Sequence, residues 1–431
     1  MNMTVYRFLS RLLSPVYRFY LWRRGLKDHA YRSGHQQRWG RYNGQLPPPG
    51  TVWVHAASVG EVRAAQALID QLLGEGRRLF ITTNTPTGLE TLHRRYGSAI
   101  QSGYPPVDVP KVVERFVSAL APAVAVFVEL EIWPNRLAVL AERRIPVALV
   151  NARLSAASLE RYQRLGVLIR QSLECLSLIC AQTDEDARRF GELGVPESRL
   201  HITGSLKFDQ EIDPVQVEAG QQLRVSLGRE RPVWVAASIR QGEADLINKA
   251  HQALRNRLPD ALLIAVPRHP ERFVWPSGKV GDRHFIRASD LGDDPPGDPE
   301  ADVLLGDTLG EMVKYLSAGD IAFVGGSLVP VGGHNPLEPA ALGKPVLMGP
   351  SVANFERIDE QLGREGARIR VQDLETLTSS LERLFRDRHT VMAMSEGAIA
   401  VVRAHQGATR RTREILDRSL LPPLSRQSAA R

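Results

Sequence analysis

Short apolar segments alternate along most of the chain with longer segments in which apolar residues recur at helical spacing. The first set of apolar segments lies at residues 51–58, 79–83, 123–130, 146–153, 178–183 and 200–205. Nearly continuous apolar strands that are separated by helices are typical of a parallel sheet covered by helices on both faces. The pattern therefore predicts an α/β domain over residues 33–210.

The alternation pauses over residues 206–214, which read LKFDQEIDP, and then starts again. The second set of apolar segments lies at residues 232–238, 261–267, 284–288, 321–326, 345–348 and 368–371. Because 431 residues exceed what one hydrophobic core usually supports, we expect a second α/β domain over residues 211–405. Residues 374–420 are predicted to be helical throughout, with the helix end and a tail over 406–431. We expect ligands in a cleft between the domains, at the carboxyl ends of the strands.

The composition describes a globular protein, since 43% of the residues are hydrophobic and 24% are charged. The two cysteines, Cys175 and Cys180, lie in an apolar stretch that has no histidine beside it. This excludes a disulfide framework and fits a reducing compartment. The acidic segment 290–302, which is rich in proline and glycine, is predicted to be a solvated turn.

The basic charge of the chain is concentrated at its N-terminus. Residues 1–32 hold seven arginine or lysine residues and one aspartate, so they carry most of the net charge of +7. This asymmetry argues against a broad nucleic-acid-binding face. Aromatic and aliphatic residues lie between the arginines, but Arg11 and Arg18 interrupt every run that could span a bilayer. We expect an interfacial helix on an anionic membrane surface; the alternative is a basic helix that packs on its own domain.

The segment 53–61, WVHAASVGE, leads from a predicted strand directly into a helix. Gly60 is expected to allow a tight turn, which places Glu61 in the first helical turn as a candidate general base. The alternative is an acid that only complements the helix dipole. Because that dipole lowers the pKa of a carboxyl group, a general base at Glu61 requires an acidic or apolar neighbour that raises it.

Such a neighbour is offered by residues 128–135, VELEIWPN, at the end of another apolar strand. Glu129 and Glu131 are two residues apart, so both side chains can point to the same side. Lys207 follows a further strand and is a candidate partner for this acidic pair. A purely structural ion pair explains the same pattern.

The glycine-rich segment 325–338, GGSLVPVGGHNPLE, follows an apolar strand of the second half. Asn335 and Pro336 are a typical helix start. Gly332 and Gly333 are expected to let the backbone approach an anion held by free N–H groups, which predicts a nucleotide-phosphate site. Glu338 could then bind ribose hydroxyl groups; the alternative is a tight turn with no ligand.

Two further loops follow strands of the same half. Residues 267–273, PRHPERF, present Arg268 and His269 between prolines, and residues 306–311, GDTLGE, place Thr308 as a capping residue before a new helix. The Asp-x-Asp pattern at Asp184 and Asp186 resembles a metal site. It follows Thr183 at a predicted helix start, where acids are expected in any case, so we expect no metal there.

The segments HAASVGE, TTNTPTG, ELEIWPN, NARLS, TGSLKFD, PRHPERF, GDTLGE and GGHNPLE occur in this order. Together they resemble the 3-deoxy-D-manno-octulosonic acid (Kdo) transferases of lipopolysaccharide synthesis, from the basic arm to about residue 405. The resemblance implies the GT-B fold, with two Rossmann-like domains facing a cleft. It also implies CMP-Kdo as the donor and the lipid A precursor (lipid IVA) as the acceptor, at the cytoplasmic face of the inner membrane. The implied reaction inverts the anomeric centre and needs neither metal nor cofactor.

The resemblance also implies roles for individual residues. Glu61 acts as the general base on the acceptor hydroxyl, and Glu131 and Lys207 stabilise the transition state. The residues implied to hold CMP are Arg268, His269, Leu309, Gly310, Glu311, Asn335, Pro336, Leu337 and Glu338. The C-terminal helix is implied to cross back onto the first domain.

Two other functions remain as alternatives at this stage. One is a two-domain transferase or epimerase that uses a UDP-sugar, and the other is a membrane-surface scaffold without catalysis. Within the HAASVGE segment, Ala56 stands where a slightly larger residue is expected from the resemblance to Kdo transferases, so contacts to the acceptor can differ. The sequence leaves open the number of Kdo residues added and the oligomeric state.

Overall fold

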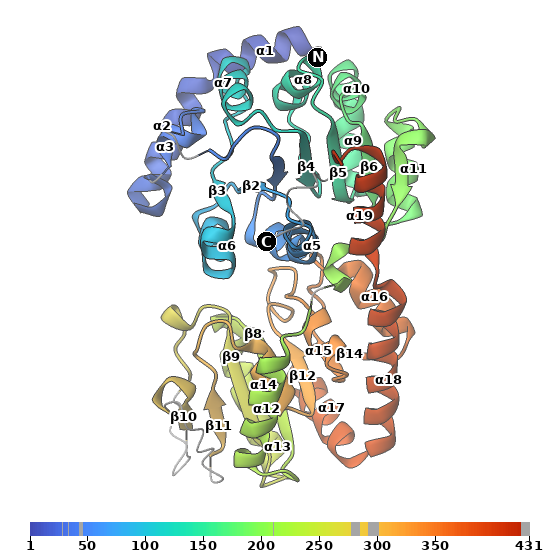
Figure 1. Cartoon of the computed structure of the whole chain (residues 1–431). Helices are drawn as coiled ribbons and strands as arrows, with labels where there is room; N and C mark the ends of the chain where they lie inside the picture. The colour runs from blue at the N-terminus through green and yellow to red at the C-terminus, as the bar shows by residue number, and fades with distance from the viewer. Residues whose placement is uncertain are drawn as a thin grey trace. The chain divides into compact units, whose positions relative to one another are not determined.

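The structure is a computed structural model that describes residues 1–27, 29–32, 34–42, 46–209, 211–276, 285–291 and 301–423 (Figure 1). The chain forms two compact units. The first comprises Met1–Gln210 together with His405–Arg431, and the second comprises Glu211–Ala404. Each unit contains one parallel sheet of seven strands with helices around it, which confirms the α/β class.

The sheet of the first unit has the strand order β3-β2-β1-β4-β5-β6-β7. Its strands are β1 Val52–His55, β2 Leu79–Thr82, β3 Gln101–Gly103, β4 Val124–Val128, β5 Val147–Ala152, β6 Leu178–Ala181 and β7 Leu200–Ile202. The apolar pattern predicts all of them except β3, whose polar residues lie at the edge of the sheet. The order reverses between β1 and β4, and in open α/β sheets ligands bind at such a reversal.

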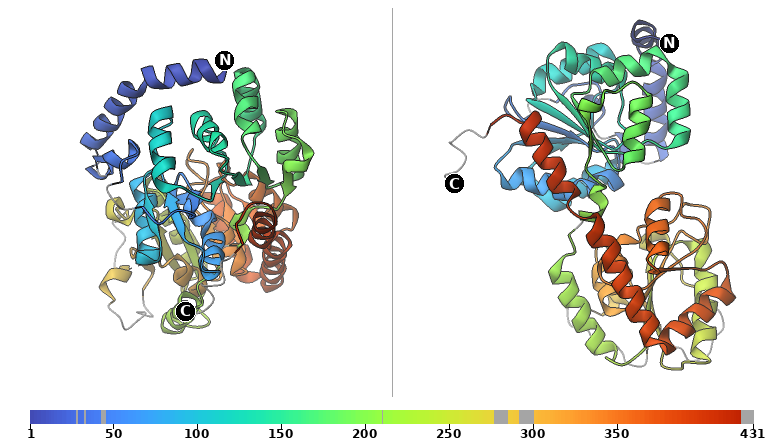
Figure 2. Two further views of the ribbon diagram at one scale, coloured as in Figure 1. Left: turned by 45° about the horizontal axis from the view of Figure 1, so that its top comes forward. Right: turned by 90° about the vertical axis from the view of Figure 1, so that its right-hand side faces the viewer.

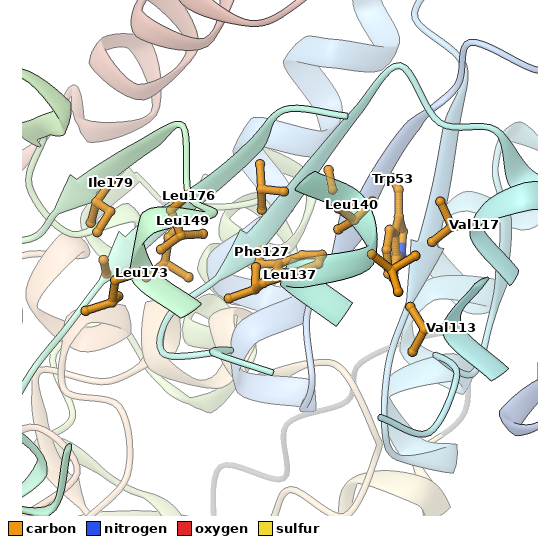
Figure 3. Close-up of a cluster of buried hydrophobic side chains, with 14 of the residues drawn as sticks. Trp53, Val113, Val117, Phe127, Leu137, Leu140, Leu149, Leu173, Leu176 and Ile179 are labelled. Atoms are coloured by element: carbon orange, nitrogen blue, oxygen red, sulfur yellow. The ribbon is translucent and has the colours of Figure 1, made fainter. Parts of the chain in front are cut away.

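Helices cover both faces of this sheet. They are α4 Val59–Ala64, α5 Gln66–Gly74, α6 Pro86–Tyr96, α7 Pro110–Leu120, α8 Pro134–Glu142, α9 Ala156–Leu165, α10 Val167–Glu174 and α11 Asp184–Glu192. Alternate residues of each strand enter separate hydrophobic clusters, as the two faces of a sheet require. Trp53 and Phe127 belong to the cluster that α8 covers (Figure 3), whereas Val54 and Val126 belong to the other.

The last helix, α19 (Ala408–Ser419), completes the second of these clusters with Ala408 and Leu416. It contacts α5 and is drawn in red against the first unit in Figure 2. The carboxylate of Asp209 accepts hydrogen bonds from the backbone N–H groups of Gly407 and Thr409, at 2.6 and 2.5 Å. The C-terminal segment is therefore part of the core of the first unit, although the whole second unit precedes it in the chain.

The sheet of the second unit has the order β10-β11-β9-β8-β12-β13-β14. Its strands are β8 Val233–Ile239, β9 Leu262–Pro267, β10 Phe285–Arg287, β11 Val303–Leu305, β12 Ile321–Val324, β13 Val346–Met348 and β14 Arg368–Arg370. Its helices are α12 Pro214–Leu227, α13 Gln241–Arg255, α14 Met312–Ala318, α15 Leu337–Ala341, α16 Glu356–Arg364, α17 Leu374–Arg386 and α18 Arg388–His405. The three-residue strand β11 is missing from the prediction. This sheet reverses its order between β8 and β12.

Two expectations about the second half of the chain are met in part. Residues 374–420 are helical as predicted, apart from short breaks that divide them into three helices, because the carboxylate of Asp387 accepts a hydrogen bond from the N–H of Thr390 and begins a new helix, and Gly407 has a φ of 88°. The acidic segment 290–302 lies outside the described residues from 292 to 300. At its end Asp302 is buried and pairs with Arg255, so this residue does not belong to a solvated turn.

The N-terminal arm forms two helices, α1 (Met3–Leu12) and α2 (Ser14–Lys27). Helix α1 contacts α8 and α10 (Figure 1) and is fastened by polar contacts. The Tyr6 hydroxyl donates to Asp108 at 2.9 Å, and Arg7 pairs with Glu142. Within the described part of the chain, no helix is long and apolar enough to cross a membrane. The first helix thus packs on its own unit, as one of the two expectations has it, while Val5, Phe8 and Leu12 remain exposed; the membrane contact stays a prediction.

Candidate functional site

The carboxyl edge of the first sheet gathers three acidic side chains where the strand order reverses. Glu61 lies in the first turn of α4, directly after β1, and Glu129 and Glu131 follow β4. Strands β1 and β4 are hydrogen-bonded neighbours, with His55 paired to Phe127 at the end of the register. The three carboxylates interact electrostatically, which shows that the fold brings together residues from two separate motifs.

The local sequence fixes Glu61 in a helix cap. The Ser58 hydroxyl oxygen accepts a hydrogen bond from the N–H of Glu61 at 3.3 Å. In return, the Glu61 carboxylate accepts hydrogen bonds from the N–H of Ala57 at 2.7 Å and from the Ser58 hydroxyl at 3.0 Å. This reciprocal pattern is a variant of the capping box, in which the acid bonds to the residue before the cap. The expected tight turn at Gly60 is wrong, because Gly60 is an ordinary helical residue.

Burial makes Glu61 a stronger base than a surface glutamate. It raises the pKa of Glu61 from 4.5 to about 7, and the negative charges of Glu129 and Glu131 contribute in the same direction. The hydrogen bonds from Ala57 and Ser58 lower the pKa, but their effect is smaller. The neighbours required for a general base are therefore present. A carboxylate with this pKa is close to the optimum for taking a proton at neutral pH.

Glu129 and Glu131 have different partners. The Lys207 ammonium forms an ion pair with Glu129 at 3.1 Å, whereas the Glu131 carboxylate contacts the Nε2 atom of buried His55 at 2.9 Å. The Trp133 indole N–H also donates to Glu131, at 2.6 Å. The two-residue spacing does not predict this division, because Glu129 adopts a left-handed conformation with a φ of 62°. Such strain in a residue other than glycine is concentrated at functional sites.

The Asp-x-Asp pattern has a structural explanation. Thr183 caps α11, and the buried Asp186 carboxylate accepts hydrogen bonds from the Thr183 hydroxyl at 2.7 Å and the Leu154 N–H at 2.9 Å. Across the described residues, no group of three or more His, Cys, Asp or Glu side chains is arranged to hold a metal ion.

The carboxyl edge of the second sheet is basic. Arg240 follows β8, Arg268 and His269 follow β9, and His334 lies in the loop after β12, so the groups flank the reversal of strand order. The Arg240 guanidinium donates a hydrogen bond to His334 Nε2 at 3.2 Å. Burial, reinforced by the positive charges of Arg240, Arg268 and His269, lowers the pKa of His334 to about 4. His334 is therefore neutral, and the arginines supply the positive charge.

The glycine-rich loop does not offer the free N–H groups expected of it. The N–H of Gly332 donates to the Ser351 hydroxyl oxygen, and the N–H of Gly333 donates to the carbonyl oxygen of Gly326, both at 2.9 Å. A Cβ atom on Gly332 would lie 2.7 Å from the Asn354 side chain. Both glycines also have a positive φ, 86° at Gly332 and 73° at Gly333, and a Cβ atom on Gly333 would lie 2.9 Å from the Ser351 carbonyl oxygen, so the conformation of the loop by itself requires glycine at these positions.

The same loop is held by a residue that the sequence reasoning missed. The buried Glu243 carboxylate accepts hydrogen bonds from the N–H groups of Gly326, Ser327 and Leu328 at 2.7 to 3.1 Å. It also accepts one from the N–H of Arg240 at 2.9 Å. Glu243 thus ties the end of β8 to the loop after β12. Its position three residues after Arg240, at a helix start, is the signal that could have identified it.

The remaining implied donor residues lie in two short segments. Asn335 Oδ1 accepts a hydrogen bond from the N–H of Leu337 at 3.1 Å, and Asn335 also contacts Glu338 at 3.4 Å. Helix α15 begins at Leu337, so Pro336, and not Asn335 as expected, occupies the cap position. In the GDTLGE segment the helix begins at Met312, and Thr308 does not cap it but bonds to the Glu311 carboxylate. Partial burial raises the pKa of Glu311, but the contacts with Thr308 and Lys314 outweigh it and lower the pKa.

Residues 33–210 match the family model for the N-terminal part of glycosyltransferases described as 3-deoxy-D-manno-octulosonic-acid transferase. A 3-deoxy-D-manno-octulosonic acid transferase of Haemophilus influenzae is 36% identical over 417 residues, which are 95% of this chain and 97% of the relative. The enzyme of the same description from Bordetella pertussis is 38% identical over 436 residues, which cover 97% of this chain and 99% of the relative.

Among solved structures, a glycosyltransferase from Rickettsia africae matches 89% of this chain and 100% of its own, with a TM-score of 0.55 and 14% identity. At this identity the likeness concerns the fold alone, which is that of the GT-B glycosyltransferases. The relatives with higher identity decide the family. The chain therefore belongs to the 3-deoxy-D-manno-octulosonic acid transferase family, and it is a glycosyltransferase of lipopolysaccharide biosynthesis.

Proposed function

We propose that the chain transfers Kdo from CMP-Kdo to the lipid A precursor lipid IVA, with inversion at the anomeric carbon and release of CMP. The observation that carries this proposal is the Glu61 carboxylate, which lies at the reversal point of the first sheet with a pKa of about 7. A sugar hydroxyl is a weak nucleophile until a base removes its proton during attack. Glu61 takes that role.

The neighbouring charges suit a single displacement with partial positive charge on the donor sugar, as in other glycosyl transfers. Glu131 is held ionised, because the hydrogen bonds from His55 and Trp133 outweigh the burial that raises its pKa. Its charge strengthens Glu61 as a base and stabilises positive charge at the anomeric centre. Lys207 forms an ion pair with Glu129 at this edge and is proposed to stabilise negative charge on the departing phosphate.

The second unit is proposed to bind CMP-Kdo. Arg240 and Arg268 provide positive charge for the donor's phosphate and carboxylate, and these side chains take the place of the backbone N–H groups that the loop uses internally. The residues proposed to complete the nucleotide site are His269, Leu309, Gly310, Glu311, Asn335, Pro336, Leu337 and Glu338. Because cations and fixed dipoles can stabilise a phosphate leaving group, this mechanism assigns no step to a metal.

The arm is proposed to hold the enzyme on the cytoplasmic face of the inner membrane. Large apolar side chains of α1 and α2 are 41–65% exposed: Val5, Phe8, Leu12, Leu13, Val16, Tyr17, Phe19, Tyr20, Trp22 and Leu26. Arginines lie among them, as in helices that bind anionic lipid surfaces. Flotation with anionic vesicles tests this: a variant with Phe19→Ser and Trp22→Ser should bind less, whereas the matched control Val215→Ser, also at an exposed apolar position, should bind normally.

The transfer itself is tested by mixing purified protein, CMP-Kdo and detergent-dispersed lipid IVA in the presence of EDTA. We expect CMP release that depends on the acceptor, together with a heavier lipid whose mass counts the Kdo residues added. A parallel reaction uses UDP-sugar donors. Release of UDP or UMP without CMP would overturn the donor assignment, and a requirement for added Mg²⁺ would redirect attention to Asp184 and Asp186.

A further inference from the structure

A chain of hydrogen bonds leads from the core of the first unit to the Glu131 carboxylate. The Trp53 indole N–H donates to the Thr82 hydroxyl oxygen at 2.9 Å, and the same oxygen lies 2.9 Å from His55 Nδ1. The other ring nitrogen, His55 Nε2, lies 2.9 Å from Glu131 Oε2. Trp133 donates to that same carboxylate oxygen from the opposite end, at 2.6 Å.

The groups at the two ends of this series of hydrogen bonds, the Trp53 indole and the Glu131 carboxylate, determine which atom donates in each bond. An indole N–H can only donate, so the Thr82 oxygen accepts from Trp53 and its own proton is available to the next member. Glu131 is ionised and can only accept, so His55 Nε2 must carry a proton. Nδ1 is then the acceptor for the Thr82 hydroxyl, which is 2.9 Å from it but 3.5 Å from the Val54 carbonyl oxygen.

The opposite arrangement is unfavourable. With the proton on Nδ1, His55 could donate to the Thr82 carbonyl oxygen at 3.1 Å, but Nε2 would then present a lone pair to a carboxylate oxygen. A doubly protonated His55 is disfavoured as well, because complete burial lowers the pKa of His55. The neutral ring with its proton on Nε2 gives each of these hydrogen bonds one donor and one acceptor without a buried positive charge on His55.

The residues linked by these hydrogen bonds lie in elements of different rigidity, which suggests what the hydrogen bonds do. His55 ends the interior strand β1 and pairs in register with Thr82 of β2. Its ring packs edge-on against the Phe127 ring, with 5.8 Å between the ring centroids. Its side chain is completely buried. Glu131 instead lies in an irregular segment between β4 and α8. A carboxylate on such a segment keeps a fixed position only if rigid neighbours hold it.

We propose that Trp53, Thr82 and His55 are positioning residues, which hold the Glu131 carboxylate beside Glu61 through a neutral His55 protonated on Nε2. The kinetic part of this inference rests on the proposed Kdo transfer, whereas the tautomer of His55 does not. The histidine of the HAASVGE motif thereby gains a role that the implied family mechanism leaves unassigned.

The tautomer is tested directly by ¹⁵N NMR of histidine-labelled full-length protein at pH 8. We expect a pyrrole-type shift for Nε2 and a pyridine-type shift for Nδ1 of His55, assigned by the loss of the signals in His55→Gln. Thr82→Val should shift Nδ1 without changing the tautomer. A protonated Nδ1 in the wild type overturns the proposal, whether or not the protein shows Kdo transfer.

The positioning role is tested by two replacements of the same residue. Glutamine can place an amide N–H near the position of Nε2, whereas leucine cannot donate. Because hydrogen bonds to charged groups are strong, we expect His55→Leu to lower kcat by about 10- to 100-fold while KM for CMP-Kdo stays unchanged. His55→Gln should recover most of the rate.

A double-mutant cycle separates positioning from a general structural role. In a Glu131→Gln background, His55→Leu should cost little further kcat, because the group that it positions has lost its charge. Trp133→Phe removes the other donor at a half-exposed position and should give a smaller loss with normal folding. Equal activities of His55→Leu and wild type, or equal losses with and without Glu131, would overturn the proposal.

Discussion

The two parallel sheets differ in the order of their outer strands but share a reversal of strand order, and they carry opposite charge at their carboxyl edges. Each reverses its strand order next to its first strand, at β1/β4 and at β8/β12. The first reversal gathers Glu61, Glu129 and Glu131, whereas the second gathers arginine and histidine side chains. The fold thus provides a similar geometric position twice, and the side chains decide that one edge is acidic and the other basic, which is why we propose proton uptake at the first edge and anion binding at the second.

The two edges also use buried glutamates differently. Glu61 accepts few hydrogen bonds and lies near two other acids, so burial raises its pKa and leaves it reactive. Glu243 accepts hydrogen bonds from four backbone N–H groups and therefore has a structural role, in which it holds the glycine-rich loop. A buried carboxylate is consequently not a catalytic signal by itself; the number of donors around it distinguishes the two cases.

The largest effect is expected from removing the base of the first edge. Glu61→Gln should lower kcat for Kdo transfer by about 10²- to 10⁴-fold, the usual contribution of general-base catalysis, with KM for CMP-Kdo nearly unchanged. Initial rates of CMP release measure it. The matched control is Glu90→Gln, which alters an exposed glutamate paired with Arg94 and should leave the rate unchanged. Similar rates for both variants would remove Glu61 from the mechanism.

The corresponding replacement at the second edge should reduce stability. Glu243→Gln turns one acceptor oxygen into a donor that faces backbone N–H groups, so we expect a loss of about 2–4 kcal/mol in the free energy of unfolding. Chemical denaturation of the full chain measures this loss. Glu230→Gln, at an exposed position, is the matched control and should be neutral. Unchanged stability of Glu243→Gln would contradict the structural role.

The basic groups of the second edge should determine donor affinity. Arg268→Ala is expected to raise KM for CMP-Kdo by about tenfold, because it removes a charge-assisted contact to an anion, and to change kcat less. Arg272→Ala serves as the control, since its side chain is 86% exposed. A fall in kcat at unchanged KM would place Arg268 in the chemical step instead.

The smallest effect concerns the pH dependence at the first edge. Because the base must be deprotonated, kcat/KM should fall as the pH drops below about 7, the pKa of Glu61. Glu129→Gln removes a negative charge that raises the pKa of Glu61. The fall of kcat/KM on the acid side of the pH profile should therefore move to lower pH. The ratio of the rates at pH 6 and pH 8 should rise about twofold. An unchanged pH profile, or a shift to higher pH, would contradict the action of the Glu129 charge on Glu61.

Much of the fold could be predicted because buried parallel strands leave a simple signal. The apolar pattern predicts every strand except two: Gln101–Gly103, which is polar and lies at the edge of its sheet, and Val303–Leu305, whose apolar run has only three residues. The helix start at Glu61 was also readable, since capping depends on residues only a few positions apart. The partner of Lys207 was only partly predictable, because the backbone at Glu129 turns left-handed.

The sequence by itself determined the α/β class, the family, the basic apolar arm and the candidate base. These follow from composition, from the period of the apolar residues and from motifs, all of which are local. Only the tertiary structure decided that burial raises the pKa of Glu61, that Glu243 occupies the N–H groups of the glycine-rich loop and that His55 holds Glu131. Each of these depends on strands that are distant in the chain and adjacent in the sheet, and on the loss of water around a charge. Neither the adjacency of distant strands nor the loss of water around a charge can be read from the spacing of residues along the sequence.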